Sequence, residues 1–264
     1  MRPLPTVRSG RFGVVTLDEL LAGEWTLEAV RHAVRTGRLE RVAAGRFAPP
    51  PPDHLTRFRQ ADLRLLRRAV AATIGDRGAV SHLGGALHHG LPIWADDPHP
   101  CVGTWSPGIR RIAGVHLHRL LDPHETVVRR GGVLVTSAAR TIVDVAREWG
   151  AEAALVPGDV ALRTGVITLP TLAIEVERVI GLPGASAARR VPGLLDPLAE
   201  SPLESRSRWH FDVHAIEQPL SQVWLYTRAG RFLGRVERCR LSDFTRVVQL
   251  RSRARRRCCS KVSL

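Results

Sequence analysis

Residues 16–48 read T-L-D-E-L-L-A-G-E-W-T-L-E-A-V-R-H-A-V-R-T-G-R-L-E-R-V-A-A-G-R-F-A, and this stretch decides the N-terminal fold. Thr16 and Glu19 have the spacing of a capping box, in which a hydroxyl and a carboxylate satisfy the first free N–H groups of a helix. The pattern predicts a short helix over residues 17–22 that a glycine ends. Thr26 is placed to cap a second helix.

The second helix is expected to have an apolar face and a basic face. Apolar side chains recur at helical spacing between Leu27 and Val34, which predicts the buried side. Residues 39–42 and 46–48 are expected to pair across an Ala-Gly turn as a two-stranded ribbon. Helix, turn, basic-faced helix and hairpin together predict a winged helix-turn-helix over residues 1–49.

Such a unit binds DNA through guanidinium groups that neutralise phosphates and reach guanine edges. The candidate contacts are the basic side chains of the second helix and the ribbon, namely Arg31, His32, Arg35, Arg41 and Arg46. The alternative is a small helical domain whose basic face is simply solvated. DNA contact is the favoured interpretation because the cap, the turn and the wing all agree.

Further along the chain, the pattern predicts three more segments. Four prolines at residues 49–52 are stiff and mark a domain boundary. Residues 53–198 alternate expected helices and strands, which predicts a mixed α/β domain, and a Pro-Gly pair at residues 157–158 is expected to kink or break one helix. Residues 199–237 are expected to form a helix and two strands, and residues 238–264 a basic tail without a fold. The predicted class is α+β.

The composition is that of a strongly basic chain that can fold. Its 264 residues carry a formal net charge of +14, and 44% of them are hydrophobic, so we expect a packed core and a polyanionic partner. Residues 238–264 contribute +8 of this charge. No apolar run is long enough for a membrane span, and the N-terminus lacks a signal-peptide core. The sequence therefore predicts a cytoplasmic protein.

Four cysteines and eleven histidines raise the question of a metal site. No C-x-x-C pair is present, so a zinc knuckle is not expected. His116 and His118 alternate on an expected strand and share a face, but no nearby carboxylate or cysteine completes a ligand set. The histidines are therefore interpreted as half-exposed polar positions, and neither a metal nor a cofactor is predicted.

The acidic residues of the central domain are interpreted as structural or solvated residues and not as catalytic ones. Asp144 lies among apolar neighbours on an expected helix, where it can accept a hydrogen bond from Arg140. The acidic pairs at residues 96–97 and 175–177 are interpreted as solvated loop and helix faces.

Several stretches resemble an actinobacterial family with an AbiEi-type antitoxin domain. They are G-V-V-T-L-D-E-L-L-A-G at 13–23, V-R-T-G-R-L-E-R-V-A-A-G-R-F at 34–47, G-A-V-S-H-L-G-G-A-L-H-H-G-L-P at 78–92, G-V-H-L-H-R at 114–119 and V-T-S-A-A-R-T-I-V-D-V-A-R at 135–147. The likeness extends over about residues 10–236. It implies an antitoxin and transcriptional autoregulator of a type IV toxin–antitoxin system. The implied partners are double-stranded DNA, a second copy of the chain, and a cognate toxin that need not be contacted directly.

The end of the chain resembles the start of a very-short-patch-repair or PD-(D/E)XK nuclease domain. E-S-P-L-E-S at 200–205 looks like its first helix, with Glu204 at the acidic position, and G-R-F-L-G-R-V-E at 230–237 ends in Glu237 where that family usually has Asp. Hydrolysis at such a site needs two or more carboxylates around Mg²⁺. The later acid and lysine of the pattern are absent, so both glutamates are interpreted as degenerate catalytic candidates. Residues 238–264 are interpreted as an out-of-frame or degraded end.

The sequence therefore favours a catalytically inactive, DNA-binding regulator. Two alternatives stay open. One is a Mg²⁺-dependent endonuclease that uses Glu204 and Glu237. The other is a protein-interaction module whose basic tail binds nucleic acid without sequence specificity.

Overall fold

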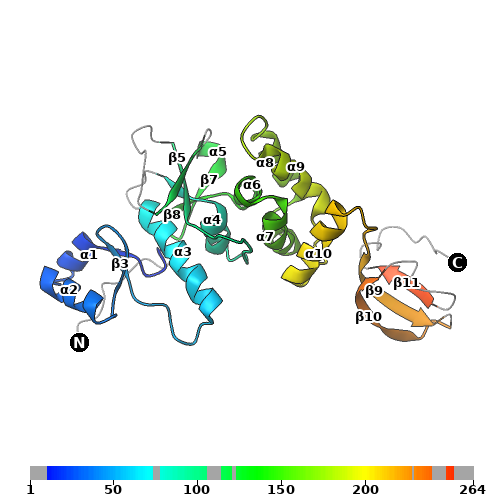
Figure 1. The fold of residues 1–264 in the computed structure, drawn as a ribbon, viewed down its shortest axis with the longest axis horizontal. Helices are drawn as coiled ribbons and strands as arrows, with labels where there is room; N and C mark the ends of the chain where they lie inside the picture. Colours follow the sequence, from blue (N-terminus) through cyan, green and yellow to red (C-terminus); the bar gives the residue numbers. More distant parts are fainter. Residues whose placement is uncertain are drawn as a thin grey trace.

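The computed structural model describes residues 11–73, 78–105, 114–120, 123–227, 229–239 and 248–252. Helices alternate with strands of three separate sheets, one of them mixed, so the predicted α+β class is confirmed. Figure 1 shows a small N-terminal unit at one end, a central sheet with its helices in the middle and a C-terminal sheet at the other end.

The N-terminal unit combines two short helices with a three-stranded sheet. Its elements are β1 (Val15–Thr16), α1 (Leu17–Ala22), α2 (Leu27–Arg35), β2 (Glu40–Ala43) and β3 (Arg46–Ala48). The strands lie in the order β1-β3-β2, and both pairs are antiparallel. Both predicted caps are formed, because Thr16 and Glu19 exchange hydrogen bonds and Thr26 accepts one from the N–H of Ala29.

The core of this unit is apolar and comes from both helices and strands. It contains Val15, Leu20, Trp25, Val30, Ala33, Leu39 and Phe47. Leu27, which the periodicity assigned to the buried face, is 49% exposed. The buried face of α2 is centred on Val30 and Ala33, and Leu27 lies at the exposed first position of the helix.

Helix α3 (Arg57–Thr73) links the N-terminal unit to the central domain. It contributes to a buried cluster that also contains Val14. Its Arg67 donates hydrogen bonds of 2.8 and 2.6 Å to the carbonyl oxygens of Phe12 and Pro49. The predicted boundary at the prolines is therefore crossed by a shared core and by the hydrogen bonds of one largely buried guanidinium.

The central sheet has five strands among the described residues. They are β4 (Ala79–Val80), β5 (Cys101–Thr104), β6 (His116–Arg119), β7 (Val127–Arg130) and β8 (Val133–Thr136), in the order β6-β5-β4-β8-β7. The β5–β6 and β4–β8 pairs are parallel, and the other two are antiparallel. Helix α4 (His82–His88) follows β4 directly. Helix α5 (Pro123–Thr126) directly precedes β7, which begins at Val127.

Five further helices form the rest of the central domain. They are α6 (Ala138–Trp149), α7 (Ala151–Arg163), α8 (Leu169–Glu177), α9 (Ala185–Leu194) and α10 (Pro202–Val213). Helix α6 lies at their centre and packs against α4, α7, α8 and α9 (Figure 1). None of the helices in the described ranges is both long and apolar enough to cross a membrane.

The Pro157-Gly158 pair does not break α7, so the predicted break is wrong. Both residues are buried within a continuous helix. A Cβ atom added at Gly158 would lie 2.6 Å from Cδ2 of Leu195, so the glycine allows a close approach of the following chain. An internal proline destabilises a helix by about 3 kcal/mol, which the burial of α7 against α6, α9 and α10 offsets.

The C-terminal sheet consists of β9 (Leu220–Thr227), β10 (Phe232–Cys239) and β11 (Val248–Ser252), with β9 in the middle and both pairs antiparallel. The prediction that regular structure ends at residue 237 is wrong in two respects: β10 continues to Cys239, and residues 248–252 form a strand. Without β11, the side of β9 that faces away from β10 would have unpaired N–H and C=O groups. Pairing with these groups allows residues 248–252 to form a strand although their composition does not indicate one. Residues 240–247 and 253–264 lie outside the described residues.

Candidate nucleic-acid interface and buried polar clusters

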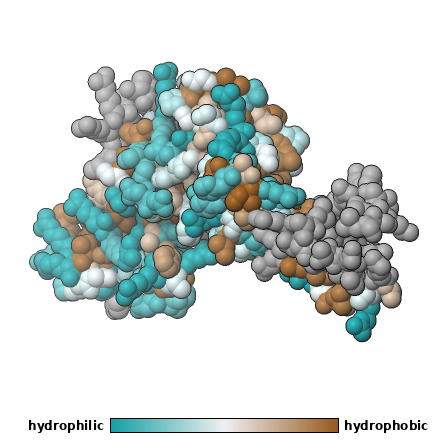
Figure 2. Space-filling model, turned by 45° about the vertical axis from the view of Figure 1, so that its right-hand side comes forward, coloured by the Kyte–Doolittle hydropathy of each residue, from teal (hydrophilic) through white to brown (hydrophobic). Residues whose placement is uncertain are grey.

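The basic face of α2 is exposed. Arg31, His32 and Arg35 all project from the side opposite the buried residues Val30 and Ala33. Within the described part of the chain, none of these three side chains pairs with a carboxylate. The surface of the N-terminal unit, at the left of Figure 2, is largely hydrophilic. This face therefore presents two guanidinium groups and one imidazole to the solvent.

The ribbon supplies the other two predicted DNA contacts. Arg41 on β2 is exposed, whereas Arg46 on β3 is half-buried and donates a hydrogen bond of 3.2 Å to the carbonyl oxygen of Ala44. The acid next to Arg41 does not neutralise it, because Glu40 pairs with Arg64 on α3 at 2.9 Å. Four of the five predicted contacts are thus exposed, and Arg46 is partly held by the turn.

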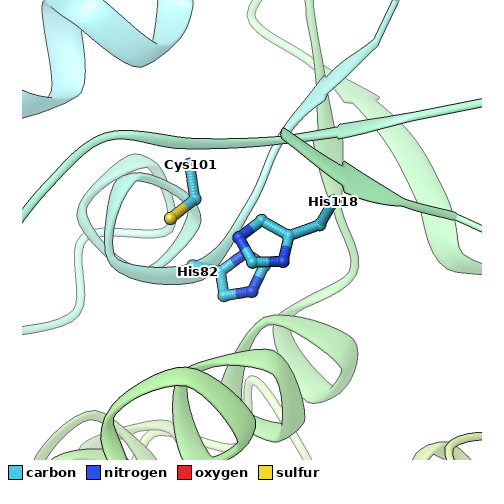
Figure 3. A group of neighbouring side chains, drawn as sticks. All are labelled: His82, Cys101 and His118. Atoms are coloured by element: carbon cyan, nitrogen blue, oxygen red, sulfur yellow. The ribbon is translucent and has the colours of Figure 1, made fainter. Parts of the chain in front are cut away.

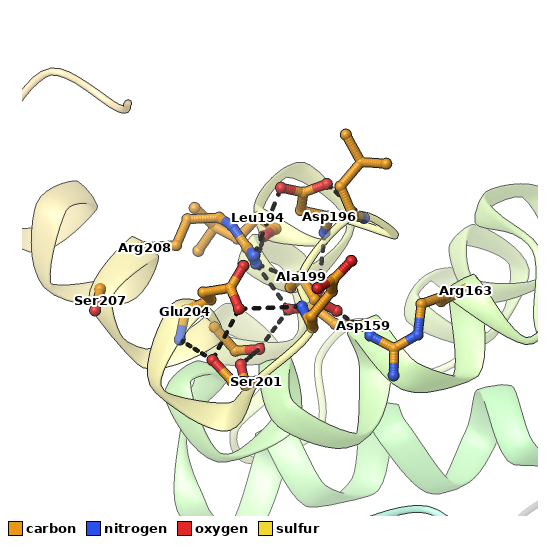
Figure 4. Close-up of polar contacts among 12 residues, drawn as sticks. Asp159, Arg163, Leu194, Asp196, Ala199, Ser201, Glu204, Ser207 and Arg208 are labelled. Atoms are coloured by element: carbon orange, nitrogen blue, oxygen red, sulfur yellow. Dashed lines mark hydrogen bonds and ion pairs between the residues drawn. The ribbon is translucent and has the colours of Figure 1, made fainter. Parts of the chain in front are cut away.

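Glu204 is buried at the start of α10 (Figure 4). Its Oε1 accepts hydrogen bonds from the Ser201 hydroxyl at 2.8 Å and from the main-chain N–H of Glu200 at 3.2 Å, while Ser201 caps the helix through the N–H of Glu204 at 3.3 Å. Its Oε2 accepts from Nε2 of Gln222 at 3.2 Å. Oε1 therefore stabilises the start of α10, and Oε2 connects it to β9.

Glu237 lies in β10, in the register between the pairs Val236–Val223 and Arg238–Ser221. The backbone of Glu237 is therefore opposite Gln222, the residue whose side chain donates to Glu204. The fold brings the two predicted candidates to the same end of the C-terminal sheet.

Asp159 on α7 is the centre of a buried network that sequence reasoning missed (Figure 4). It accepts hydrogen bonds from the Ser205 hydroxyl at 2.6 Å, from the guanidinium of Arg208 at 2.9 Å and from the main-chain N–H of Asp196 at 2.7 Å. Burial raises the pKa of the Asp159 carboxyl, and Arg208 opposes this shift. The network joins α7 to α10 and to the segment after α9, and it explains why the helix after residue 200 docks on the central domain.

Asp144 occupies a second buried network, on α6. It is 1% exposed and accepts hydrogen bonds of 2.9 Å from Arg140 and from Arg147, so the predicted Arg140 contact is confirmed. Glu175 on α8 lies 4.0 Å from Arg140 and 3.8 Å from Arg178. Glu175 is itself buried, so the solvated-face prediction is wrong for it, because α8 packs this side against α6. Burial raises the pKa of the Glu175 carboxyl.

The other acidic residues that were predicted to be solvated are exposed to solvent. Glu177 is exposed one half-turn from Glu175, and Asp96 and Asp97 are exposed in a loop. The prediction of solvated acids is confirmed for these three residues.

The histidines of the central domain are more closely grouped than their spacing indicated. His82 at the start of α4, Cys101 on β5 and His118 on β6 offer ligand atoms that all lie within 4.8 Å of one another (Figure 3). His99, His116 and Glu148 form a second group by the same measure. The prediction that no nearby cysteine or carboxylate accompanies His116 and His118 is therefore wrong, because the folded chain brings Cys101 and Glu148 close to them.

Strand pairing explains this grouping. The parallel register sets Cys101 beside His116 and Gly103 beside His118, so alternate residues of β5 and β6 face the same side. Glu148, near the end of α6, lies 3.9 Å from His118 and 3.3 Å from His99. These contacts join residues far apart in the sequence, which no local spacing reveals.

Burial shifts the pKa values of the side chains in this cluster so that their uncharged forms are favoured. It lowers the pKa of His82 well below its usual value, and it also lowers the pKa of His118. The same effect raises the pKa of the Cys101 thiol. The prediction of half-exposed histidines is also wrong for His88, which is buried and whose pKa falls to about 4, chiefly through desolvation.

Comparison with known proteins gives relatives without an assigned activity. No family model matches the chain. Two uncharacterized proteins of Mycobacterium tuberculosis, MT2308 of strain CDC 1551 / Oshkosh and Rv2248 of strain ATCC 25618 / H37Rv, are each 29% identical over 201 residues, covering 75% of this chain and 68% of theirs. The crystal structure of the RV2827C protein from Mycobacterium tuberculosis aligns at a TM-score of 0.41 and 16% identity, covering 79% of this chain and 78% of that one.

Proposed function

We propose that this chain is a DNA-binding transcriptional regulator of the type IV antitoxin kind, with an N-terminal winged helix-turn-helix and no catalytic activity. The observation that carries the proposal is the exposed basic face of α2. Arg31 and Arg35 stand on it without an acidic partner in the described part of the chain. A basic helix face of this kind fits the negative potential of the DNA major groove.

The order of elements supports the same assignment. Helix α1, a turn, helix α2 and the β2–β3 ribbon follow one another within 33 residues. The Thr26 cap fixes the residue at which α2 begins. In this proposal α2 is the recognition helix and the ribbon is the wing. Arg41 and Arg46 on the ribbon would contact the phosphate backbone, while Arg31 and Arg35 would reach base edges.

Fluorescence anisotropy with a labelled duplex from the region upstream of the protein's own gene tests this proposal. The double variant Arg31→Ala plus Arg35→Ala is expected to bind more weakly by about thirtyfold or more, because each of the two base-edge contacts contributes about 1–3 kcal/mol. The matched control is Arg189→Ala plus Arg231→Ala, which removes the same charge from exposed positions outside the N-terminal unit. Equal losses in the two double variants would remove the recognition-helix assignment.

The basic end of the chain is tested separately. Truncation after Ser252 keeps all three strands of the C-terminal sheet and removes residues 253–264. The proposal expects sequence preference to survive this truncation, with only a smaller salt dependence of binding. If all DNA affinity disappears with those residues, the chain is instead a module with a non-specific nucleic-acid-binding tail.

The absence of catalysis rests on how Glu204 is used. Its Oε1 accepts a hydrogen bond within the helix cap and its Oε2 accepts one from Gln222, so the carboxylate has a structural role at the start of α10. Incubation of supercoiled plasmid with Mg²⁺ is expected to give no nicking by the wild type. Metal-dependent nicking that Glu204→Gln abolishes would establish the endonuclease alternative.

A further inference from the structure

Three side chains of the types that bind late transition metals converge beside β5 and β6. His82, Cys101 and His118 present two imidazoles and one thiol whose ligand atoms all lie within 4.8 Å of one another (Figure 3). Around a tetrahedral Zn²⁺ ion with bonds of about 2.0–2.3 Å, such atoms would be roughly 3.5 Å apart. Small side-chain rotations are therefore enough to close the three groups around one ion.

His82 is held in a special position. It is the first residue of α4 and has a φ of 53°, a left-handed backbone conformation that non-glycine residues adopt rarely. The Ser81 hydroxyl lies 2.8 Å from its Nδ1. A partner on one ring nitrogen orients the ring and leaves the other nitrogen for a metal, as is usual around zinc-binding histidines.

The imidazole ring of His118 has a buried nitrogen without a hydrogen bond in the described part of the chain. Its Nε2 is buried and has no hydrogen-bond partner among the described residues, and its nearest carboxylate, Glu148, is 3.9 Å away. A buried ring nitrogen without a partner is unfavourable, since desolvation is then uncompensated. A cation held between the three side chains would supply the partner that this nitrogen lacks.

We propose that His82, Cys101 and His118 bind one zinc-class divalent ion and that Glu148 completes its coordination. A thiolate and a carboxylate together balance the charge of a divalent ion, so the buried site would be neutral overall. Imidazole and thiolate ligands favour zinc and its neighbours over Mg²⁺ or Ca²⁺.

The second histidine group then has a supporting role. His99 and His116 lie 3.3 and 3.6 Å from Oε1 of Glu148, the oxygen that does not approach His118. They hold the carboxylate from the solvent side, in the manner of the outer partners that orient metal ligands. The ion would add a direct connection between the start of α4, strands β5 and β6 and the end of α6, beyond the hydrogen bonds that already pair β5 with β6.

The test is metal analysis of the full chain, purified without chelator, followed by substitution with Co²⁺. The result expected is about one zinc per chain and, with Co²⁺, the charge-transfer absorption of a cobalt–thiolate bond. Cys101→Ser is expected to abolish that absorption, and His118→Gln to reduce bound metal to near zero. Because Cys239, Cys258 and Cys259 can also bind cobalt, all variants are made in a background in which these three cysteines are serine.

The control variant is Arg119→Ala, an exposed neighbour on β6 that leaves every proposed ligand in place. It is expected to keep both the stoichiometry and the cobalt–thiolate absorption. The proposal is overturned if the wild type holds no stoichiometric metal, or if its metal and absorption survive Cys101→Ser. Circular dichroism of each variant shows whether a loss of metal accompanies a loss of fold, and His118→Gln, at a partly exposed strand position, provides the readout if Cys101→Ser does not fold.

Discussion

The arginines of the central helices and those of α2 lie in opposite environments. Arg140 and Arg208 are 4% and 8% exposed, and each binds a buried aspartate at 2.9 Å. Arg31 and Arg35 are exposed and pair with no carboxylate in the described part of the chain. A buried guanidinium needs its carboxylate to offset desolvation, whereas an exposed one keeps its water and stays available to an external anion. Net charge alone does not separate these two roles.

The largest effect is expected from breaking a buried pair. Asp144→Ala leaves the charges of Arg140 and Arg147 without their carboxylate inside the helical layer, and it should lower the free energy of unfolding by about 3–5 kcal/mol. Urea denaturation followed by circular dichroism measures this change. Asp97→Ala removes an exposed acid and is the control, with an expected change within about 0.5 kcal/mol. A loss below about 1 kcal/mol for Asp144→Ala would show that the buried network does not stabilise the fold.

The second prediction concerns Arg31 and Arg35, the exposed arginines of α2. Arg31→Ala plus Arg35→Ala should weaken DNA binding by about thirtyfold or more and change the free energy of unfolding by less than about 0.5 kcal/mol. If the arginines contact phosphates, the slope of log affinity against log salt should also fall by about 2. Anisotropy titrations at several salt concentrations measure both. A large loss of stability would mean that α2 needs these side chains for folding.

A substitution of arginine by lysine sharpens the comparison. Arg140→Lys keeps the charge but loses the planar set of N–H donors that reaches Asp144, and it should destabilise the fold by about 1–2 kcal/mol. Arg31→Lys should leave stability unchanged and preserve a phosphate contact, while a paired contact to a guanine edge would be lost. Equal stability losses for the two variants would contradict the distinction between the environments.

The smallest effect concerns pH. Burial raises the pKa of Glu175 above the unfolded value of 4.5, so the folded state holds this proton more tightly. Its contribution to stability is therefore present at low pH and is lost as pH rises through the folded pKa. Glu175→Gln removes that contribution, and the decline in stability from pH 4.5 towards neutrality should become shallower. Unfolding measurements across this range check the slope, and a steeper decline in the variant would reverse the sign assigned to burial.

Local features were predicted well because they depend on neighbouring residues. The caps at Thr16 and Thr26 each satisfy free N–H groups within three residues, so the sequence contains the whole interaction. The Asp144–Arg140 contact was predicted for the same reason, since the two residues are one helical turn apart. Pro157 was misjudged because the burial that stabilises α7 comes from other helices.

The sequence by itself determined the α+β class, the two helices and the β2–β3 ribbon of the N-terminal unit and the basic face of α2, because periodicity and capping operate over a few residues. Strand β1, the third strand of that sheet, was not predicted. Only the tertiary structure decided which charged and metal-binding groups meet. Asp159 reaches Arg208 across 49 residues, and His82, Cys101 and His118 meet because β5 and β6 pair in parallel beside the start of α4. Burial and strand register are properties of the packed chain, and they convert dispersed side chains into buried ion pairs and a ligand set.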